Sequence, residues 1–531
     1  MRLKFAVAAR PCAERSRESE PRRPGAISHH REEWTIPSEP SWKKPFSRSV
    51  LEGTGLITIA GGFSRLLSLL SAPILTRLLG PGPYGVVALL GTVTSFASMV
   101  GLAGVDHSYA RYYFDGTQEE RAGVERLCWR LSIAISCVIA LVASVGWWMG
   151  SASLGLSGNL AVMVAAGVGL GTLNTMAVTR QRLLGAYHRI AGSIIGASGV
   201  GVALAITFAY AWRRDAWSLL LSAVIGNTIG VAIAGLPPRA TYFRQSGLSL
   251  RRRGEVLRLG LAGSIIGPMY WLMNSVDRWL IGLWWGQESL GVYAFSQSVG
   301  MIGLVLNSAI TLTWFPEMTR LYDADPSNSS EKIGRMWARL VGLFFGSWLA
   351  VSAAGGDVIR LVAAPWFHAG AVFIPWIAGG VLFYGIASLA NTGLLLRKRL
   401  APVAVWWVAG AIVNTALTTV LVRAYGALGA AVAGCFSYAL IAIGVMATAQ
   451  VRFHLVIPWR HLAAAGGLAL GAGVVMAFPW AGSALASLAL KFPVGLACVA
   501  AMGWIVAPDW MGRLRKREFL RPTSGTGDSG A

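Results

Sequence analysis

Charged residues are scarce in this 531-residue chain: Lys, Arg, Asp and Glu together make up 13% of it, whereas hydrophobic residues make up 54%. That charged share is about half of the roughly 25% that a soluble domain carries. The five cysteines form no CxxC pair and no metal-ligand spacing, which argues against a disulfide scaffold or a zinc site. No Walker A sequence is present, so we expect this chain not to hydrolyse ATP. We expect no metal and no other cofactor.

About fourteen apolar segments dominate the sequence. Each is long enough to cross roughly 30 Å of hydrocarbon as a helix, at about 1.5 Å per residue. The sequence therefore predicts an all-α polytopic membrane protein with about fourteen transmembrane helices. The predicted spans lie near 54–79, 86–107, 131–150, 159–179, 191–211, 217–237, 259–284, 292–314, 340–362, 372–395, 401–422, 427–449, 461–480 and 489–507.

Positive charge is distributed unevenly between the segments that join these spans. If the N-terminus is cytoplasmic, 38 of the 46 Lys and Arg residues fall in inner segments. Such a bias is the positive-inside rule, and it predicts a cytoplasmic (inner) membrane protein with both termini in the cytoplasm. The net charge of +22 then faces anionic membrane lipids, and we expect no nucleic-acid partner.

The chain also repeats itself. The pattern Gly-x4-Gly-Val-x-Ala occurs at 80–88 and again at 286–294, and Arg-x-Tyr follows both copies, beginning at Arg111 and Arg320. Each half holds six spans, an even number, so both halves enter the membrane in the same direction as parallel repeats. We predict two six-helix lobes with a cavity between them, plus two C-terminal helices. The predicted parts are a disordered basic cytoplasmic tail (1–53), an N-terminal lobe (54–237), a basic cytoplasmic linker (238–258), a C-terminal lobe (259–449), helices thirteen and fourteen (450–507) and a cytoplasmic tail (508–531).

Diffuse sequence patterns over roughly 54–450 resemble a known family. The run 62–67 (Gly-Phe-Ser-Arg-Leu-Leu) continues to Arg-Leu-Leu-Gly-Pro-x2-Tyr-Gly at 77–85, and the second half carries Ser-Val-Asp-Arg at 275–278 and Trp-Phe-Pro at 314–316. These segments resemble bacterial polysaccharide flippases, the O-antigen and exopolysaccharide exporters of the multidrug/oligosaccharidyl-lipid/polysaccharide superfamily. The resemblance implies a two-lobed transporter that moves an undecaprenyl-diphosphate-linked oligosaccharide from the inner to the outer leaflet. The expected partners are that polyprenyl-diphosphate-linked glycan and membrane lipids, with a polysaccharide polymerase and a chain-length regulator as further candidates.

A charge in the middle of a predicted span gives an independent indication of function. Arg65 lies near mid-depth in the first span, where an arginine costs about 2.5–3.5 kcal/mol unless it has a partner or a wet cavity. On a helix it shares a small and polar stripe with Ser68. A permanently charged guanidinium with paired donors suits a diphosphate. We therefore predict Arg65 and Ser68 as residues of a diphosphate and glycan cavity.

The seventh predicted span carries a matching set of polar residues. Asn274, Asp277 and Arg278 fall on one face of a continuous helix, and the repeat makes this span the counterpart of the first. We predict that they face Arg65 across the central cavity and bind the same headgroup. The alternative is that Asp277 and Arg278 only bond to neighbouring helices or backbone.

Further residues have candidate roles in loading, coupling or bending. Arg111 and Arg320, at inner helix ends, are predicted topology anchors or loading sites. Asp106 beside His107 is an interfacial polar cluster or a proton-coupling pair. Pro73 and Pro268, one in the first helix of each half, are predicted hinges, because proline kinks a helix.

Three other functions remain open. A lipid II flippase shares the expected topology and basic lumen. A drug/cation antiporter of the same superfamily would need a carboxylate deep in the N-terminal lobe, and the first six spans offer only Asp106, near an edge. A membrane enzyme acting on lipid-linked glycans, such as an O-antigen polymerase or ligase, normally uses a long outer loop, whereas every predicted outer loop here is short. We therefore expect a transporter and not an enzyme.

Overall fold

The computed structural model describes residues 48–114, 117–237, 248–263, 266–324, 329–396, 401–452 and 454–506. Nearly all of the two predicted tails and the first half of the predicted linker lie outside these residues. Every regular element within the described ranges is a helix, as predicted. The first half contains α1 (Arg48–Leu79), α2 (Pro81–Leu102), α3 (Val105–Tyr112), α4 (Gln118–Gly150), the 3-10 turns η2 (Ser151–Leu154) and η3 (Gly158–Leu160), α5 (Ala161–Leu183), α6 (Tyr187–Ala211) and α7 (Ala216–Ala234).

The second half begins with shorter helices and ends with a separate pair. It contains α9 (Leu250–Gly263), α10 (Ile266–Met273), α11 (Val276–Gly300), η4 (Met301–Gly303), α12 (Leu304–Ala324), α13 (Ser329–Val362), η5 (Pro365–Phe373), α14 (Ile374–Leu396), α15 (Ala401–Arg452), α16 (Trp459–Ala477) and α17 (Ala484–Val506).

Twelve helical stretches of the described chain are long and apolar enough to cross a membrane. Two of them, Trp271–Thr311 and Pro402–Val451, are interrupted by a glycine with non-helical backbone angles, Gly286 in α11 and Gly426 in α15. Division at these glycines is consistent with the predicted fourteen spans, and that count stays a prediction.

The repeat predicted from sequence has the same local conformation in both halves. Gly80, which precedes α2, has φ 71° and ψ 179°, and Gly286 has φ 81° and ψ 175°. L-amino acids other than glycine rarely adopt this region, because a Cβ would clash with the backbone. Each glycine therefore allows the chain to reverse between two antiparallel helices, as a duplication of one hairpin would require.

Two predicted boundaries differ from the observed ones. The second span was expected to reach residue 107, but α2 ends at Leu102, where Ala103 (φ 46°) and Gly104 (φ 67°) turn the chain into α3. The predicted linker contains most of α9, which packs on α3: Ser108 Oγ donates a hydrogen bond of 2.7 Å to Val256 O. The end of α2 was missed because average hydropathy over a long window does not change at a single left-handed turn. Helix α9 was missed because a segment rich in basic residues can still form an amphipathic helix.

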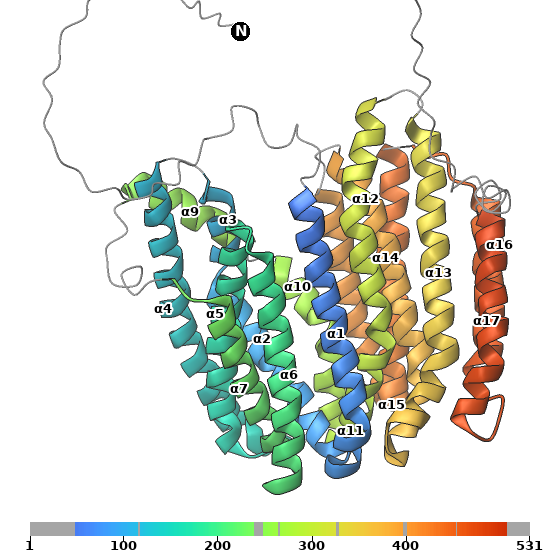
Figure 1. Cartoon of the computed structure of the whole chain (residues 1–531), viewed down its shortest axis with the longest axis horizontal. Helices are drawn as coiled ribbons and strands as arrows, with labels where there is room; N and C mark the ends of the chain where they lie inside the picture. Colours follow the sequence, from blue (N-terminus) through green and yellow to red (C-terminus); the bar gives the residue numbers. More distant parts are fainter. Residues whose placement is uncertain are drawn as a thin grey trace, which may run out of the picture. The chain divides into compact units, whose positions relative to one another are not determined.

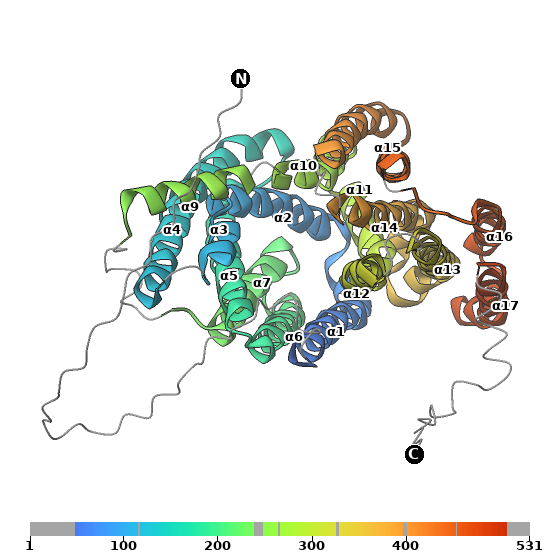
Figure 2. The same cartoon turned by 90° about the horizontal axis from the view of Figure 1, so that it is seen from above.

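The helices of residues 49–531 form two groups that meet along α2 and α11 (Figures 1 and 2). One group contains α2 to α7 with α9 lying across α3, and the other contains α11 to α15. Helix α1 lies between them, beside α6 on one side and α12 on the other (Figure 2). The C-terminal pair α16 and α17 packs on α13, at the outside of the second group.

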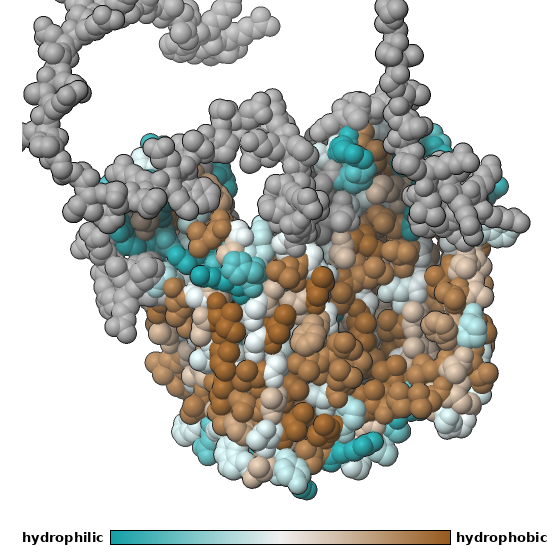
Figure 3. Space-filling model, viewed as in Figure 1, coloured by the Kyte–Doolittle hydropathy of each residue, from teal (hydrophilic) through white to brown (hydrophobic). Residues whose placement is uncertain are grey.

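The surface is consistent with a membrane protein. Brown, hydrophobic side chains form a broad band between polar ends in Figure 3. Large apolar side chains of α1 such as Ile59 are well exposed, at 70%. In water such a surface would be unstable, whereas a lipid environment accommodates it. The chain is a multi-pass membrane protein.

Candidate functional site

A cavity of about 590 Å³ lies between α1 and its neighbours from both groups of helices. Its walls come from α1, the beginning of α2, α6, α7, the second part of α11 and η4. All but five of its lining residues belong to the first half of the chain. The described lining consists of Ser64, Arg65, Ser68, Leu69, Ser71, Ala72, Leu75, Tyr84, Ala197, Ser198, Gly201, Val202, Ala205, Leu219, Ser222, Ala223, Asn227, Phe295, Ser298, Val299, Met301 and Ile302.

Arg65 is the only charged side chain in this described lining, and it is exposed to the cavity. One guanidinium nitrogen, Nη1, donates a hydrogen bond of 3.3 Å to Met301 O, which connects α1 to η4. Ser68, one turn further along α1, is also exposed to the cavity. The cavity therefore contains both predicted residues of the first span, with most guanidinium donors still available for a ligand.

The two ends of the cavity differ in polarity. The Ser64 hydroxyl lies 2.5 Å from that of Ser198, and α7 packs against α6 so that Gly226 touches Ala197. These contacts place Asn227, the next residue on α7, at the same end of the cavity as Arg65.

The opposite end is aromatic and apolar. Tyr84 contacts Phe295 and Phe367, with ring centroids 6.0 Å and 5.4 Å away, and it packs with Leu75 and Leu219. The cavity thus runs from a cationic end to an aromatic end.

Beyond the aromatic end, the two copies of the repeat touch each other. A Cβ at Gly85 of α2 would overlap the carbonyl of Gln287, and a Cβ at Gly291 of α11 would overlap the carbonyl of Pro81. Only glycine allows two backbones to approach this closely. The repeated Gly-x4-Gly pattern therefore brings the two halves into direct contact next to Tyr84 of the cavity lining.

The predicted residues of the seventh span do not share the cavity of Arg65. Asn274 and Asp277 line a separate pocket of about 60 Å³ between α11, α14 and α15, and only Met301 borders both spaces. Asp277 is 7% exposed and accepts a hydrogen bond of 2.6 Å from the Tyr293 hydroxyl.

Arg278 is held in place by protein partners. Its Nη2 and Nε donate to Gln297 Oε1 at 2.7 Å and 3.2 Å, and its backbone N–H donates to Asp277 Oδ1 at 2.8 Å. Residues 274 and 275 form a turn between α10 and α11, so the predicted continuous helix is interrupted there, although Asn274 and Asp277 still line one pocket. The contacts agree with the alternative in which these side chains bond within their own lobe.

The candidate loading and coupling residues lie away from the described cavity lining. Asp106 and His107 are on α3, where His107 Nδ1 lies 3.1 Å from Asp106 Oδ1 and the histidine side chain is 65% exposed. Arg111 is in the last turn of the same helix and its guanidinium lies over the Tyr112 ring. Arg320, on α12, forms an exposed ion pair of 2.7 Å with Glu317. None of these contacts tests loading or coupling, and both roles stay predictions.

A neighbouring, partly buried polar cluster joins α3, α4 and α5. The Tyr109 hydroxyl donates to Glu125 Oε1 at 3.2 Å, and Arg180 Nε donates to the same oxygen at 2.8 Å. Burial, with a smaller effect of the Glu125 carboxylate, raises the pKa of Tyr109 well above its ordinary value. The tyrosine therefore stays protonated and keeps donating.

The predicted hinges occupy different positions in their helices. Pro73 is inside α1, where it removes one backbone hydrogen bond, whereas Pro268 is the third residue of α10. Proline is accommodated in a first helical turn, because the N–H it lacks has no partner there. A kink is therefore expected at Pro73, and bending at either proline remains a prediction.

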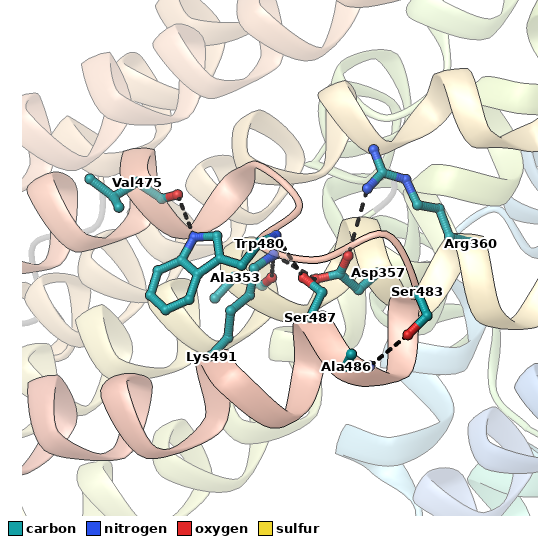
Figure 4. Close-up of polar contacts among 9 residues, drawn as sticks. All are labelled: Ala353, Asp357, Arg360, Val475, Trp480, Ser483, Ala486, Ser487 and Lys491. Atoms are coloured by element: carbon teal, nitrogen blue, oxygen red, sulfur yellow. Dashed lines mark hydrogen bonds and ion pairs between the residues drawn. The ribbon is translucent and has the colours of Figure 1, made fainter.

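Sequence reasoning missed a buried ion cluster between α13 and α17, drawn in Figure 4. Lys491 Nζ donates to Asp357 Oδ2 at 2.5 Å and to Ala353 O at 3.1 Å, and Ser487 Oγ donates to the same carboxylate oxygen at 2.8 Å. Arg360 lies 3.7 Å from the other oxygen. The sequence does contain an indication of this cluster: Asp357 and Lys491 each lie within an apolar segment, where ionisable side chains normally pair with one another.

Within the described ranges, no three His, Cys, Asp or Glu side chains lie close enough to hold a metal ion. The described cavity lining likewise offers no carboxylate. What the arrangement provides is a single guanidinium, an amide and several hydroxyls in a membrane-embedded space between two repeats.

The fold defines a polytopic membrane transporter with many apolar helices. A family described as "Polysaccharide biosynthesis protein" matches residues 74–353, which is more than half of the chain. The chain belongs to this family, as a polysaccharide flippase of the multidrug/oligosaccharidyl-lipid/polysaccharide superfamily.

Individual relatives agree with this assignment. The succinoglycan biosynthesis transport protein ExoT of Rhizobium meliloti (strain 1021) is 24% identical over 402 residues, covering 72% of this chain and 75% of that protein. The fold is similar to that of the lipid II flippase MurJ in an inward closed conformation, with a TM-score of 0.68, 13% identity, and coverage of 86% of this chain and 99% of the other. An inward-facing multidrug resistance transporter of the MATE family gives a TM-score of 0.55 at 15% identity, over 73% and 94% of the two chains.

Proposed function

We propose that this flippase moves an undecaprenyl-diphosphate-linked oligosaccharide from the inner to the outer leaflet of the bacterial cytoplasmic membrane, by alternating access through the Arg65 cavity. Both termini are then cytoplasmic, as the charge distribution predicts. The first residues of α1 lie on the cytoplasmic side, so the Gly85–Gly291 contact lies on the outer side. The glycan is destined for an O-antigen, exopolysaccharide or capsule.

One observation carries this proposal: the only charged side chain in the described lining is a guanidinium, and hydroxyl groups surround it. A guanidinium binds phosphate oxygens with paired, charge-assisted hydrogen bonds. The described lining offers no carboxylate, which an exporter of cationic drugs would use to bind its substrate. We retain Arg65 and Ser68 as substrate-binding residues. Asn274, Asp277 and Arg278 are proposed to act on the substrate only indirectly, through the conformation of their own lobe.

The test is complementation in cells that lack the protein. Lipid-linked oligosaccharide is expected to accumulate on the inner face, and the wild-type protein should clear it. Arg65→Ala should fail at normal expression, because losing a hydrogen bond to a charged group costs about 1.5–3 kcal/mol, or roughly ten- to a hundredfold in binding. Arg65→Lys should rescue in part, since lysine keeps the charge but loses the paired geometry.

Arg77→Ala is the matched control. It removes the same charge from the last turn of the same helix, where the side chain is exposed and does not line the cavity. Equal failure of Arg65→Ala and Arg77→Ala would contradict a specific role for Arg65. Sensitivity to cationic dyes without accumulation of lipid-linked glycan would favour drug export, and accumulation of lipid II would favour the peptidoglycan precursor as substrate.

A further inference from the structure

The hydroxyl groups of the cavity share one feature: their protons are already used within the protein. Ser68 Oγ donates to Ser64 O, and Ser71 Oγ donates to Ser68 O. The same pattern holds for Ser222, which donates to Leu219 O at 2.8 Å, and Ser298, which donates to Ala294 O at 3.1 Å. A hydroxyl has one proton and two lone pairs. These serines therefore offer no donor to the cavity, and the two exposed ones, Ser68 and Ser298, present lone pairs to it.

The remaining two serines behave in the same way. Ser198 Oγ donates to Ile194 O at 2.7 Å, so its only proton is engaged. In the contact between Ser64 and Ser198, the donor must then be Ser64. None of the six lining serines is thus a donor toward a ligand, and the four that are not buried, Ser64, Ser68, Ser198 and Ser298, can act as acceptors.

The donors of the described lining are few and lie at known positions. Arg65 and the Asn227 amide are at one end, and the Tyr84 hydroxyl is at the other. Along α1, the residues from Arg65 to Leu75 rise about 15 Å at 1.5 Å per residue. Ser64 and Ser198 lie at the Arg65 end and Ser68 follows one turn further along α1, so a headgroup anchored by its diphosphate at Arg65 would place its first sugars beside these acceptors.

We propose that this acceptor-lined cavity selects headgroups whose first sugars after the diphosphate are uncharged, an inference that rests on the proposed flippase function. The hydroxyls of a neutral sugar can donate to the serine lone pairs. A uronic acid or other acidic sugar brings a carboxylate, which only accepts hydrogen bonds and would face other acceptors. The single guanidinium is already engaged by the diphosphate, so that carboxylate lacks a compensating charge.

Reconstituted transport with two synthetic lipids tests the proposal. Both are polyprenyl-diphosphate trisaccharides in vesicles of phosphatidylethanolamine and phosphatidylglycerol, one built from neutral hexoses and the other with a hexuronic acid as its second sugar. Arrival in the opposite leaflet is measured by quenching of a fluorophore on the terminal sugar. We expect the neutral lipid to move at least about tenfold faster, because mismatched polar groups in a site discriminate strongly.

The outcomes separate the two proposals. Equal rates, or a faster acidic lipid, overturn the neutral-sugar selectivity and leave the flippase function intact. Transport of neither lipid overturns the flippase function, and the selectivity falls with it.

A charge placed in the cavity gives an independent check. Asn227→Lys adds a second cation at the Arg65 end and should reduce the preference for the neutral lipid at least threefold, whereas Asn227→Gln keeps the amide and should retain it. An unchanged preference in correctly folded Asn227→Lys protein would show that cavity charge does not set the selectivity, which also overturns the proposal.

Discussion

Replacing Lys491 by methionine tests how the C-terminal helix pair is held to the rest of the chain. The Lys491 and Asp357 side chains are 4% and 1% exposed, so the change leaves a carboxylate without its closest cation in a buried setting. The remaining partners are the Ser487 hydroxyl and Arg360, whose side chain is 36% exposed and lies 3.7 Å away. Neither replaces a direct contact of 2.5 Å.

The expected loss follows from the physics of buried ion pairs. Removing one partner of such a pair typically costs about 3–5 kcal/mol, because the other charge stays buried without compensation. Replacing both charges, by Asp357→Leu together with Lys491→Met, should recover most of that loss, since two apolar side chains then share the space. An exposed pair on the same helix, Arg335 with Glu331, provides the control, and Arg335→Met should cost less than about 1 kcal/mol.

Thermal unfolding in nanodiscs and hydrogen exchange of α16 and α17 measure the effect. Because this pair packs on the chain chiefly through α13, we expect faster exchange there before global unfolding. The reasoning is refuted if Lys491→Met is as stable as the wild type, or if the double variant is as damaged as the single one. Either result would mean that helix packing alone holds the pair.

Two further predictions concern the contact between the lobes and the interior of the second one. Gly85→Ala should reduce transport at least tenfold, because the added methyl group overlaps the Gln287 carbonyl. Gly91→Ala on the same helix is the control and should retain transport, since a Cβ there meets nothing within 4 Å. Equal transport by both variants would contradict a close approach of the two backbones at Gly85. Tyr293→Phe should lower the free energy of unfolding by about 1–3 kcal/mol, because it removes the hydroxyl that donates to buried Asp277; an unchanged unfolding midpoint in denaturant would contradict this.

Much of the fold could be predicted from the sequence, because length and hydropathy determine which segments can cross a membrane. The repeated pattern also contains Gly80 and Gly286, and both have positive φ angles in the structure. What could not be predicted was where a long apolar stretch bends. The left-handed turn at Ala103 and the break at 274–275 change little in average hydropathy, yet they determine which way the following side chains point.

The candidate site was predictable to the extent that a single residue carried a strong physical signal. Arg65 stood out because a charge within an apolar span is costly, and it does line the cavity. Asn274 and Asp277 were assigned to the cavity of Arg65 because the repeat makes their span the counterpart of the first, and in the structure they share a separate pocket of the second half. The serines of α6 and α7 gave no signal, since serine is common in membrane helices and becomes informative only once its hydrogen-bond partner is known.

The two halves of the chain share a backbone plan but differ in chemistry. Gly80 and Gly286 reverse the chain in the same way, whereas Arg65 faces an open cavity and Arg278 is bound by Gln297. Most of the cavity lining therefore belongs to one half, with only five residues from the other. Under alternating access, a headgroup bound mainly to one lobe can stay bound while the second lobe moves away. If the contact between Gly85 and Gly291 then separated, the headgroup would become accessible from the opposite side while its binding site stayed intact. A site shared equally between the two lobes would be divided by the same movement.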